Sequence, residues 1–169
     1  MISEDYKFVY NYHSYLKYLP KAEQELLEYL KKGMKQKTIG SLMRISQGAV
    51  SSRIQRIKKR LNFIQSWEKF KIIDSDLERL TPLNREILKI LSMTTCQSET
   101  ALLINERFHL TGRSKMTQVK IRHRFERSLQ EIEEWSKEEK NYIKYIEFFT
   151  LIKNNLYLLH EVRLPQFER

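Results

Sequence analysis

Apolar residues recur every three or four positions along most of the chain, which is the spacing of one face of an α-helix. In residues 49–64 this apolar stripe consists of Val50, Ile54, Ile57 and Leu61. Residues 21–31 and 36–43 repeat the pattern over shorter lengths, and only 4 Gly and 3 Pro interrupt the whole sequence. The pattern predicts an all-α fold.

Gly, Pro and Ser residues divide residues 19–64 into three helices. Pro20 suits the first turn of a helix over 21–31, and Gly33 is placed to end it. Ser46 can cap the helix over 49–64, after a turn at residues 45–48. Gly40 lacks a side chain where the second and third helices would cross. The expected core of this unit is Ile39, Leu42, Ile45, Val50, Ile54 and Ile57.

The positive charge is concentrated rather than spread. The chain has 31 Lys+Arg against 21 Asp+Glu, a formal net charge of +10, which favours a polyanionic partner: nucleic acid first, an anionic membrane surface second. A second basic stretch, from Arg107 to Arg127, precedes an acidic run from Glu131 to Glu139. Between Tyr29 and Trp67 there is no acid, and the basic residues are Lys31, Lys32, Lys35, Lys37, Arg44, Arg53, Arg56, Lys58, Lys59 and Arg60.

Residues 19–61 combine Leu-Pro and Glu-Leu-Leu in the first helix with Gln-Lys-x-Ile-Gly in the second and Ile-Ser-x-x-x-Val-x-x-Arg-Ile-x-Arg in the third. With this combination the segment resembles DNA-binding region four of bacterial sigma factors and the related helix-turn-helix of response regulators. The resemblance implies that the third helix reads base edges in the major groove, while cations hold the phosphates. The expected DNA-binding residues are Lys37, Thr38, Gln47, Ser51, Ser52, Arg53, Gln55, Arg56, Lys58 and Lys59.

A weaker second copy follows in residues 80–132. At an offset of 61 residues, Glu25 matches Glu86 and Gln36 matches Gln97; at an offset of 71, Val50 matches Ile121. About ten residues are therefore inserted at the turn of the second copy. Its expected DNA-binding residues are Arg113, Lys115, Thr117, Gln118, Lys120, Arg122, Arg124 and Arg127. The alternative is a helix pair that docks the domains and has no DNA role.

The register of the last helix in this copy can be read in two ways. We prefer the one in which Val119 faces outward, because the alternative aligns Val119 with His123 and Glu126. The preferred buried stripe is Ile121, Phe125, Leu129 and Ile132.

The sequence predicts tandem helix-turn-helix units with a helical linker and a helical tail. The expected segments are an N-terminal aromatic helix (1–18), a first unit (19–64), a packed linker (65–79), a second unit (80–134), and a C-terminal helix and tail (135–169). The linker carries Phe70 and the tail ends in a stretch, 154–167, that suits a short strand. The expected apolar stripe of the tail helix is Tyr142, Ile143, Ile146 and Phe149.

Catalytic and metal chemistry find little support in the sequence. The single Cys96 excludes a disulfide framework. No Gly-rich phosphate loop is present, and the histidines, His13, His109, His123 and His160, lack ligand spacing. An acidic group that suits a metal-dependent nuclease lies between predicted helices, where Asp is common as a cap: Asp74, Asp76 and Glu78. We therefore expect no enzyme activity and no cofactor.

Together these features predict a cytoplasmic, sequence-specific double-stranded DNA-binding protein that acts as a transcription regulator. The sequence shows neither the features of a secretory signal nor an apolar run long enough to span a membrane. The residues before the first unit, 1–18, are too few for a promoter-melting region, so we expect action beside RNA polymerase. The alternatives are a module that uses a sigma-like fold to bind RNA polymerase or another protein, and the DNA-recognition subunit of a packaging or recombination complex.

Overall fold

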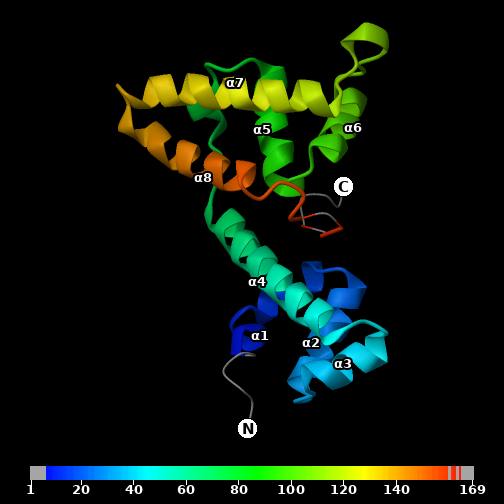
Figure 1. The fold of residues 1–169 in the computed structure, drawn as a ribbon. Helices are drawn as coiled ribbons and strands as arrows, with labels where there is room; N and C mark the ends of the chain where they lie inside the picture. The colour runs from blue at the N-terminus through cyan, green and yellow to red at the C-terminus, as the bar shows by residue number, and fades with distance from the viewer. Residues whose placement is uncertain (1–6, 160, 163, 165–169) are drawn as a thin grey trace. The chain divides into compact units, whose positions relative to one another are not determined.

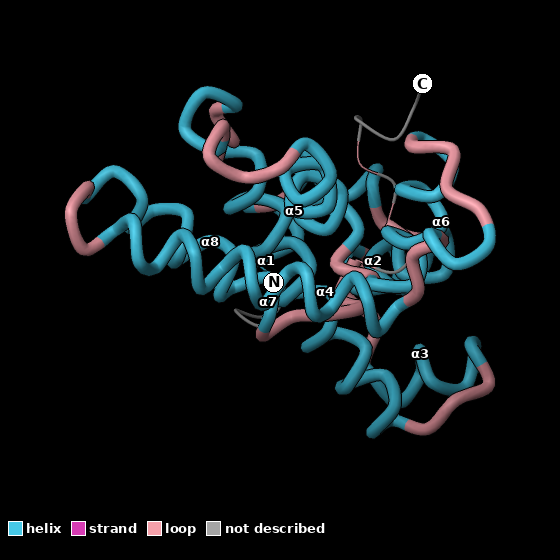
Figure 2. The backbone as a smooth tube through the Cα atoms, turned by 90° about the horizontal axis from the view of Figure 1, so that it is seen from above, coloured by secondary structure: helices cyan, strands magenta, loops and turns pink. Residues whose placement is uncertain are grey.

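The computed structural model describes residues 7–159, 161, 162 and 164 (Figure 1). In this part of the chain every regular element is helical, and the helices are joined only by loops and turns (Figure 2), which confirms the all-α class. The chain divides into two units, one of residues 1–69 with 161–169 and one of residues 70–160. No helix among the described residues is both long and apolar enough to cross a membrane.

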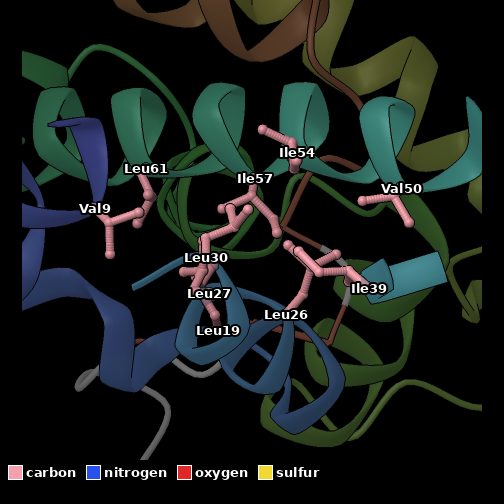
Figure 3. Packing of buried hydrophobic residues seen from close by; sticks show 10 residues of the cluster. All are labelled: Val9, Leu19, Leu26, Leu27, Leu30, Ile39, Val50, Ile54, Ile57 and Leu61. Atoms are coloured by element: carbon pink, nitrogen blue, oxygen red, sulfur yellow. The ribbon is translucent and has the colours of Figure 1, made fainter. Parts of the chain in front are cut away.

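The first unit packs its helices around one apolar core. Its elements are α1 (Lys7–Asn11), the 3-10 helix η2 (His13–Tyr18), α2 (Lys21–Lys31), α3 (Gln36–Met43) and α4 (Gln47–Lys69). Figure 3 shows the stripe of α4 pointing toward the leucines of α2. The buried core consists of Val9, Leu19, Leu26, Leu27, Leu30, Ile39, Val50, Ile54, Ile57 and Leu61. Leu42, expected in this core, is instead 53% exposed, and Met43 packs there.

The turn between α3 and α4 is only three residues long. Arg44 takes a left-handed backbone conformation with φ of 58°, and the Ile45 amide donates to the Gly40 carbonyl oxygen over 2.9 Å. A Cβ on Gly40 would lie 2.7 Å from the Ile45 carbonyl oxygen. Gly40 is therefore required by the turn itself, and not by the crossing of the two helices. The Ser46 hydroxyl accepts from the Ala49 amide at 3.0 Å, so the expected cap is confirmed.

The helix α4 is longer at both ends than the sequence indicates. It begins at Gln47, directly after its cap, and continues to Lys69. Phe63 and Ile64 are buried, which continues the apolar stripe beyond Leu61. The first five residues assigned to the linker therefore belong to this helix.

The second unit packs α8 along α7, with α5 and α6 against the other part of α7 (Figure 1). Its elements are η3 (Asp74–Leu77), α5 (Pro82–Thr94), α6 (Gln97–Arg107), η4 (Gly112–Ser114), α7 (Gln118–Ser136), η5 (Lys140–Tyr142) and α8 (Ile143–Lys153). One apolar cluster joins α5, α6 and α7: Ile87, Ile90, Ala101, Ile104, Met116 and Ile121.

The helices of the two units begin at matching positions. The starts of α3 and α6, Gln36 and Gln97, differ by 61 residues, and those of α4 and α7, Gln47 and Gln118, differ by 71. The extra residues are divided between a longer helix, 11 residues in α6 against 8 in α3, and a longer turn over residues 108–117. The preferred register of α7 is confirmed: Val119 is 51% exposed, and the buried residues are Ile121, Phe125, Leu129 and Ile132.

The segment after α4 is anchored on α8. The Phe70 ring stacks on Phe148 with centroids 3.9 Å apart. The Tyr145 hydroxyl donates to Asp76 over 2.8 Å and accepts from the Ile73 amide at 3.0 Å. Burial raises the pKa of Tyr145 to about 12, so its hydroxyl keeps the proton that it donates. The buried stripe here is Tyr142, Tyr145, Phe148, Phe149 and Ile152; Ile143, expected in it, is 43% exposed.

The expected C-terminal strand is wrong within the described residues, where residues 154–159 form turns. Thr95, at the end of α5, accepts both the Tyr157 amide on its carbonyl oxygen and the Leu159 amide on its hydroxyl. These bonds hold the segment to the second unit as turns rather than in a sheet. Farther on, Val162 and Leu164 are buried and group with the first unit. Residues 1–6, 160, 163 and 165–169 lie outside the described part, including the ends of both predicted terminal segments.

Two glycines of the first unit offer a matched test of the turn. We expect Gly40→Ala to lower the free energy of unfolding by about 1–3 kcal/mol, because its methyl group meets a backbone oxygen that cannot move alone. Gly48→Ala should be neutral or slightly stabilising, because the nearest atom is the Ser46 Oγ at 3.9 Å. Urea unfolding of the two variants measures the difference. Equal stabilities would show that the turn tolerates a side chain.

Candidate nucleic-acid interface

The helix α4 turns a polar face away from the core. Its buried residues recur at helical spacing, so the positions between them must face solvent. The exposed positions of its first three turns are Gln47, Gly48, Ser52, Arg53, Gln55, Arg56 and Lys59. Ser51 and Lys58 are half-buried at the edge of this face. An α-helix with such a face has the dimensions to enter the major groove of DNA.

The start of α3 adds a second part to this surface. Lys37 and Thr38 are exposed in its first turn, and Lys35 precedes it without a capping hydrogen bond from its side chain. Helix N-termini carry unpaired amides and a partial positive charge, which attract anionic groups. Cations and free amides therefore coincide at the start of α3.

Most cations on α3, α4 and their turn are not used inside the unit. Among the described residues from Lys35 to Arg60, the following are exposed and have no ion-pair partner: Lys35, Lys37, Arg44, Arg53 and Lys59. Of these, Lys35 and Arg44 belong to the acid-free stretch but not to the DNA-binding residues that the sequence predicts. The signal that could have found them is that stretch itself, since without acids nearby a cation lacks a local partner. We call these five residues the free cations.

Three cations on α4 are engaged in contacts within the unit. Arg60 is only 1% exposed and forms a buried ion pair with Glu23 of α2. The same carboxylate lies 3.5 Å from Nη2 of Arg56, whose side chain remains largely exposed. The Lys58 ammonium lies 5.0 Å from the centre of the Phe8 ring, a cation–π distance. Arg60 therefore belongs to the core, and Lys58 contacts α1.

Four of the eight expected site residues in the second unit hold that unit together. Thr117 caps α7 by accepting from the Lys120 amide at 3.2 Å. Gln118 bonds to the side chains of Ser98 and Tyr157. Arg124 is half-buried and donates to Asn84 over 3.1 Å, and the Lys120 ammonium donates to backbone carbonyls. The other four are exposed and have no ion-pair partner among the described residues: Arg113, Lys115, Arg122 and Arg127.

Two residues of the acidic group, Asp74 and Asp76, form contacts within the second unit. Asp74 pairs with Lys89, and Asp76 accepts from Tyr145 and lies 3.8 Å from the Lys144 ammonium. Over the described residues, no three His, Cys, Asp or Glu side chains gather as a metal site would require. Cys96 is buried in the second unit, and His160 lies outside the described part.

Comparison with known proteins adds no relative to these observations. No family model, curated protein or solved structure matches the chain. The chemistry of the surface must therefore be inferred from its own residues.

The buried ion pair can be tested against a surface pair on the same helix. We expect Glu23→Gln to lower the free energy of unfolding by about 3–5 kcal/mol, because the buried Arg60 would lose the carboxylate with which it pairs. Glu28→Gln removes the partner of Lys31 from an exposed position of α2 and should leave stability nearly unchanged. Thermal and urea unfolding of both variants provide the comparison. If Glu23→Gln matched Glu28→Gln, the pair would not be a core contact.

Proposed function

We propose that the protein binds double-stranded DNA in a sequence-specific manner through α3 and α4 and acts as a transcription regulator. The observation that carries this proposal is the set of free cations on α3, α4 and their turn, together with two exposed uncharged residues of α4, Ser52 and Gln55, which we call the polar strip. A surface stabilised by its own ion pairs would carry acids between its cations, and here the segment from Tyr29 to Trp67 has none.

The two kinds of residue on this surface suit the two parts of DNA recognition. Cations that meet phosphates release condensed counterions, and this release supplies affinity that depends on salt but not on sequence. Ser52 and Gln55 are exposed and uncharged, and amide and hydroxyl groups can read base edges by hydrogen bonds. The proposal therefore assigns sequence-independent affinity to the free cations and sequence preference to the polar strip.

One observation favours protein binding as a second candidate function. In the second unit, Leu102 on α6 is 67% exposed and Val119 on α7 is 51% exposed. Apolar side chains exposed to this extent mark a protein-binding surface where they form one contiguous patch. RNA polymerase is the partner implied by the resemblance to sigma factors. A stable complex formed without DNA, and lost in Leu102→Ser, would support this role.

The salt dependence of binding tests the free cations. We expect the logarithm of the affinity for duplex DNA to fall linearly with the logarithm of salt concentration, and Lys59→Ala to reduce this slope by about 0.9, one phosphate contact. Lys21→Ala is the control, because Lys21 is exposed at the start of α2, outside the proposed surface. Fluorescence anisotropy over a salt series gives both slopes. An affinity that does not change with salt would contradict DNA binding.

The polar strip is tested by separating specific from non-specific binding. After selection of a preferred sequence from a random pool, Gln55→Ala should weaken binding to that sequence by about 1–3 kcal/mol and hardly affect random DNA. Gln65→Ala makes the same change on the same helix, beyond the proposed surface, and should affect neither. Equal losses on both DNAs for Gln55→Ala would show that this face of α4 does not read bases.

A further inference from the structure

The ten-residue turn between α6 and α7, residues 108–117, is held in one conformation by side chains of the flanking helices. Asn105 of α6 accepts the Met116 amide at 2.6 Å and donates to the Met116 carbonyl oxygen over 3.0 Å. The Met116 side chain is 5% exposed and packs in the core of the unit. The backbone of Leu110 also bonds to Asn105, over 2.9 Å. We call this segment the insert.

The tip of the insert is fastened by Lys120. Its ammonium donates to the carbonyl oxygens of Arg113 and Lys115, over 3.0 Å in both cases. The Lys120 ammonium therefore bonds to the backbone of the insert. The side chains of Arg113 and Lys115 are exposed, and neither has an ion-pair partner in the described part of the chain.

The two units differ in where they carry cations. At matching positions, the first unit has Lys37 where the second has Ser98, and Arg44 where the second has Asn105. Lys35 and Lys59 are likewise replaced by neutral residues, Cys96 and Gln130. The insert, which stands where the first unit has a turn of only three residues, adds Arg113 and Lys115. From Phe108 to Phe125 the second unit contains no acid.

We propose that the insert is a preformed phosphate-binding loop, in which Arg113 and Lys115 contact the DNA backbone and Lys120 is a positioning residue that holds them. This inference rests on the proposed function and adds a second contact to it. A loop ordered before binding loses little conformational entropy in the complex, so its two contacts contribute more of their interaction to affinity. Lys120 itself makes no contact with DNA.

A double-mutant cycle in the full-length protein tests the assignment. The full chain is required because a truncation after Arg79 would also remove the buried Val162 and Leu164 from the first unit. The probe is a labelled mixed-sequence duplex of about 40 base pairs, which spans several turns of the major groove. We expect Arg113→Ala with Lys115→Ala to reduce the salt slope by about 1.8. Lys120→Met should weaken binding in the wild-type background and have no effect when Arg113 and Lys115 are already replaced.

The outcomes separate this inference from the proposed function. If Lys120→Met reduces the slope by about 0.9 in both backgrounds, Lys120 contacts a phosphate directly and the positioning role is wrong. If Lys59→Ala changes the slope and the paired Arg113 and Lys115 variant does not, the insert is not a phosphate loop although the protein binds DNA. If neither changes it, the proposed function fails. Lys153→Met, on the exposed part of α8, controls for the loss of one charge.

Hydrogen exchange gives a readout that does not depend on DNA. In the native protein the amides of Ser114 and Lys115 bond to Thr111 and Gly112 within the insert. We expect Lys120→Met to speed their exchange and to leave the amides in the middle of α7 protected. Unchanged exchange at both amides would overturn the positioning role. General loss of protection would also overturn it, since Lys120 would then stabilise the whole unit.

Discussion

The burial of one apolar stripe on α4 is the constraint on which the first unit depends. Val50, Ile54, Ile57 and Leu61 can leave water only by packing against α2 and α3, and their spacing fixes the rotation of α4 about its own axis. This rotation also determines which way the residues between the stripe positions face. The polar strip faces solvent because the stripe does not.

The same constraint acts on charge. Arg60 lies at the flank of α4 that meets α2, and Glu23 supplies an opposite charge there that offsets the cost of burying the guanidinium. The free cations have no ion-pair partner among the described residues, and their side chains are exposed to water. One helix thus carries a structural arginine and exposed basic residues within a few positions of each other. Arg60 differs from the exposed basic residues because α2 places the Glu23 carboxylate next to it.

Local features could be read from the sequence, and contacts between distant residues could not. The register of α7 follows from side-chain spacing alone, because Ile121 and Phe125 share a face that Val119 does not. The Ser46 cap is equally local. The pairing of Arg60 depends on a residue 37 positions away, and the exposure of Leu42 depends on how α3 lies against its neighbours. The Lys120 bonds depend on a loop conformation that periodicity does not describe, and the DNA-binding role of the surface stays a prediction.

The first unit is discontinuous in sequence, since residues 161–169 group with residues 1–69 and the second unit lies between them. A ribosome therefore releases the whole of the second unit before it releases Val162 and Leu164, which are buried parts of the first. During synthesis, these two residues join the first unit only after residues 70–160, about half of the polypeptide, have emerged. The helices α2, α3 and α4 are able to assemble early, but the first unit is completed only after residues 70–160 have been synthesised.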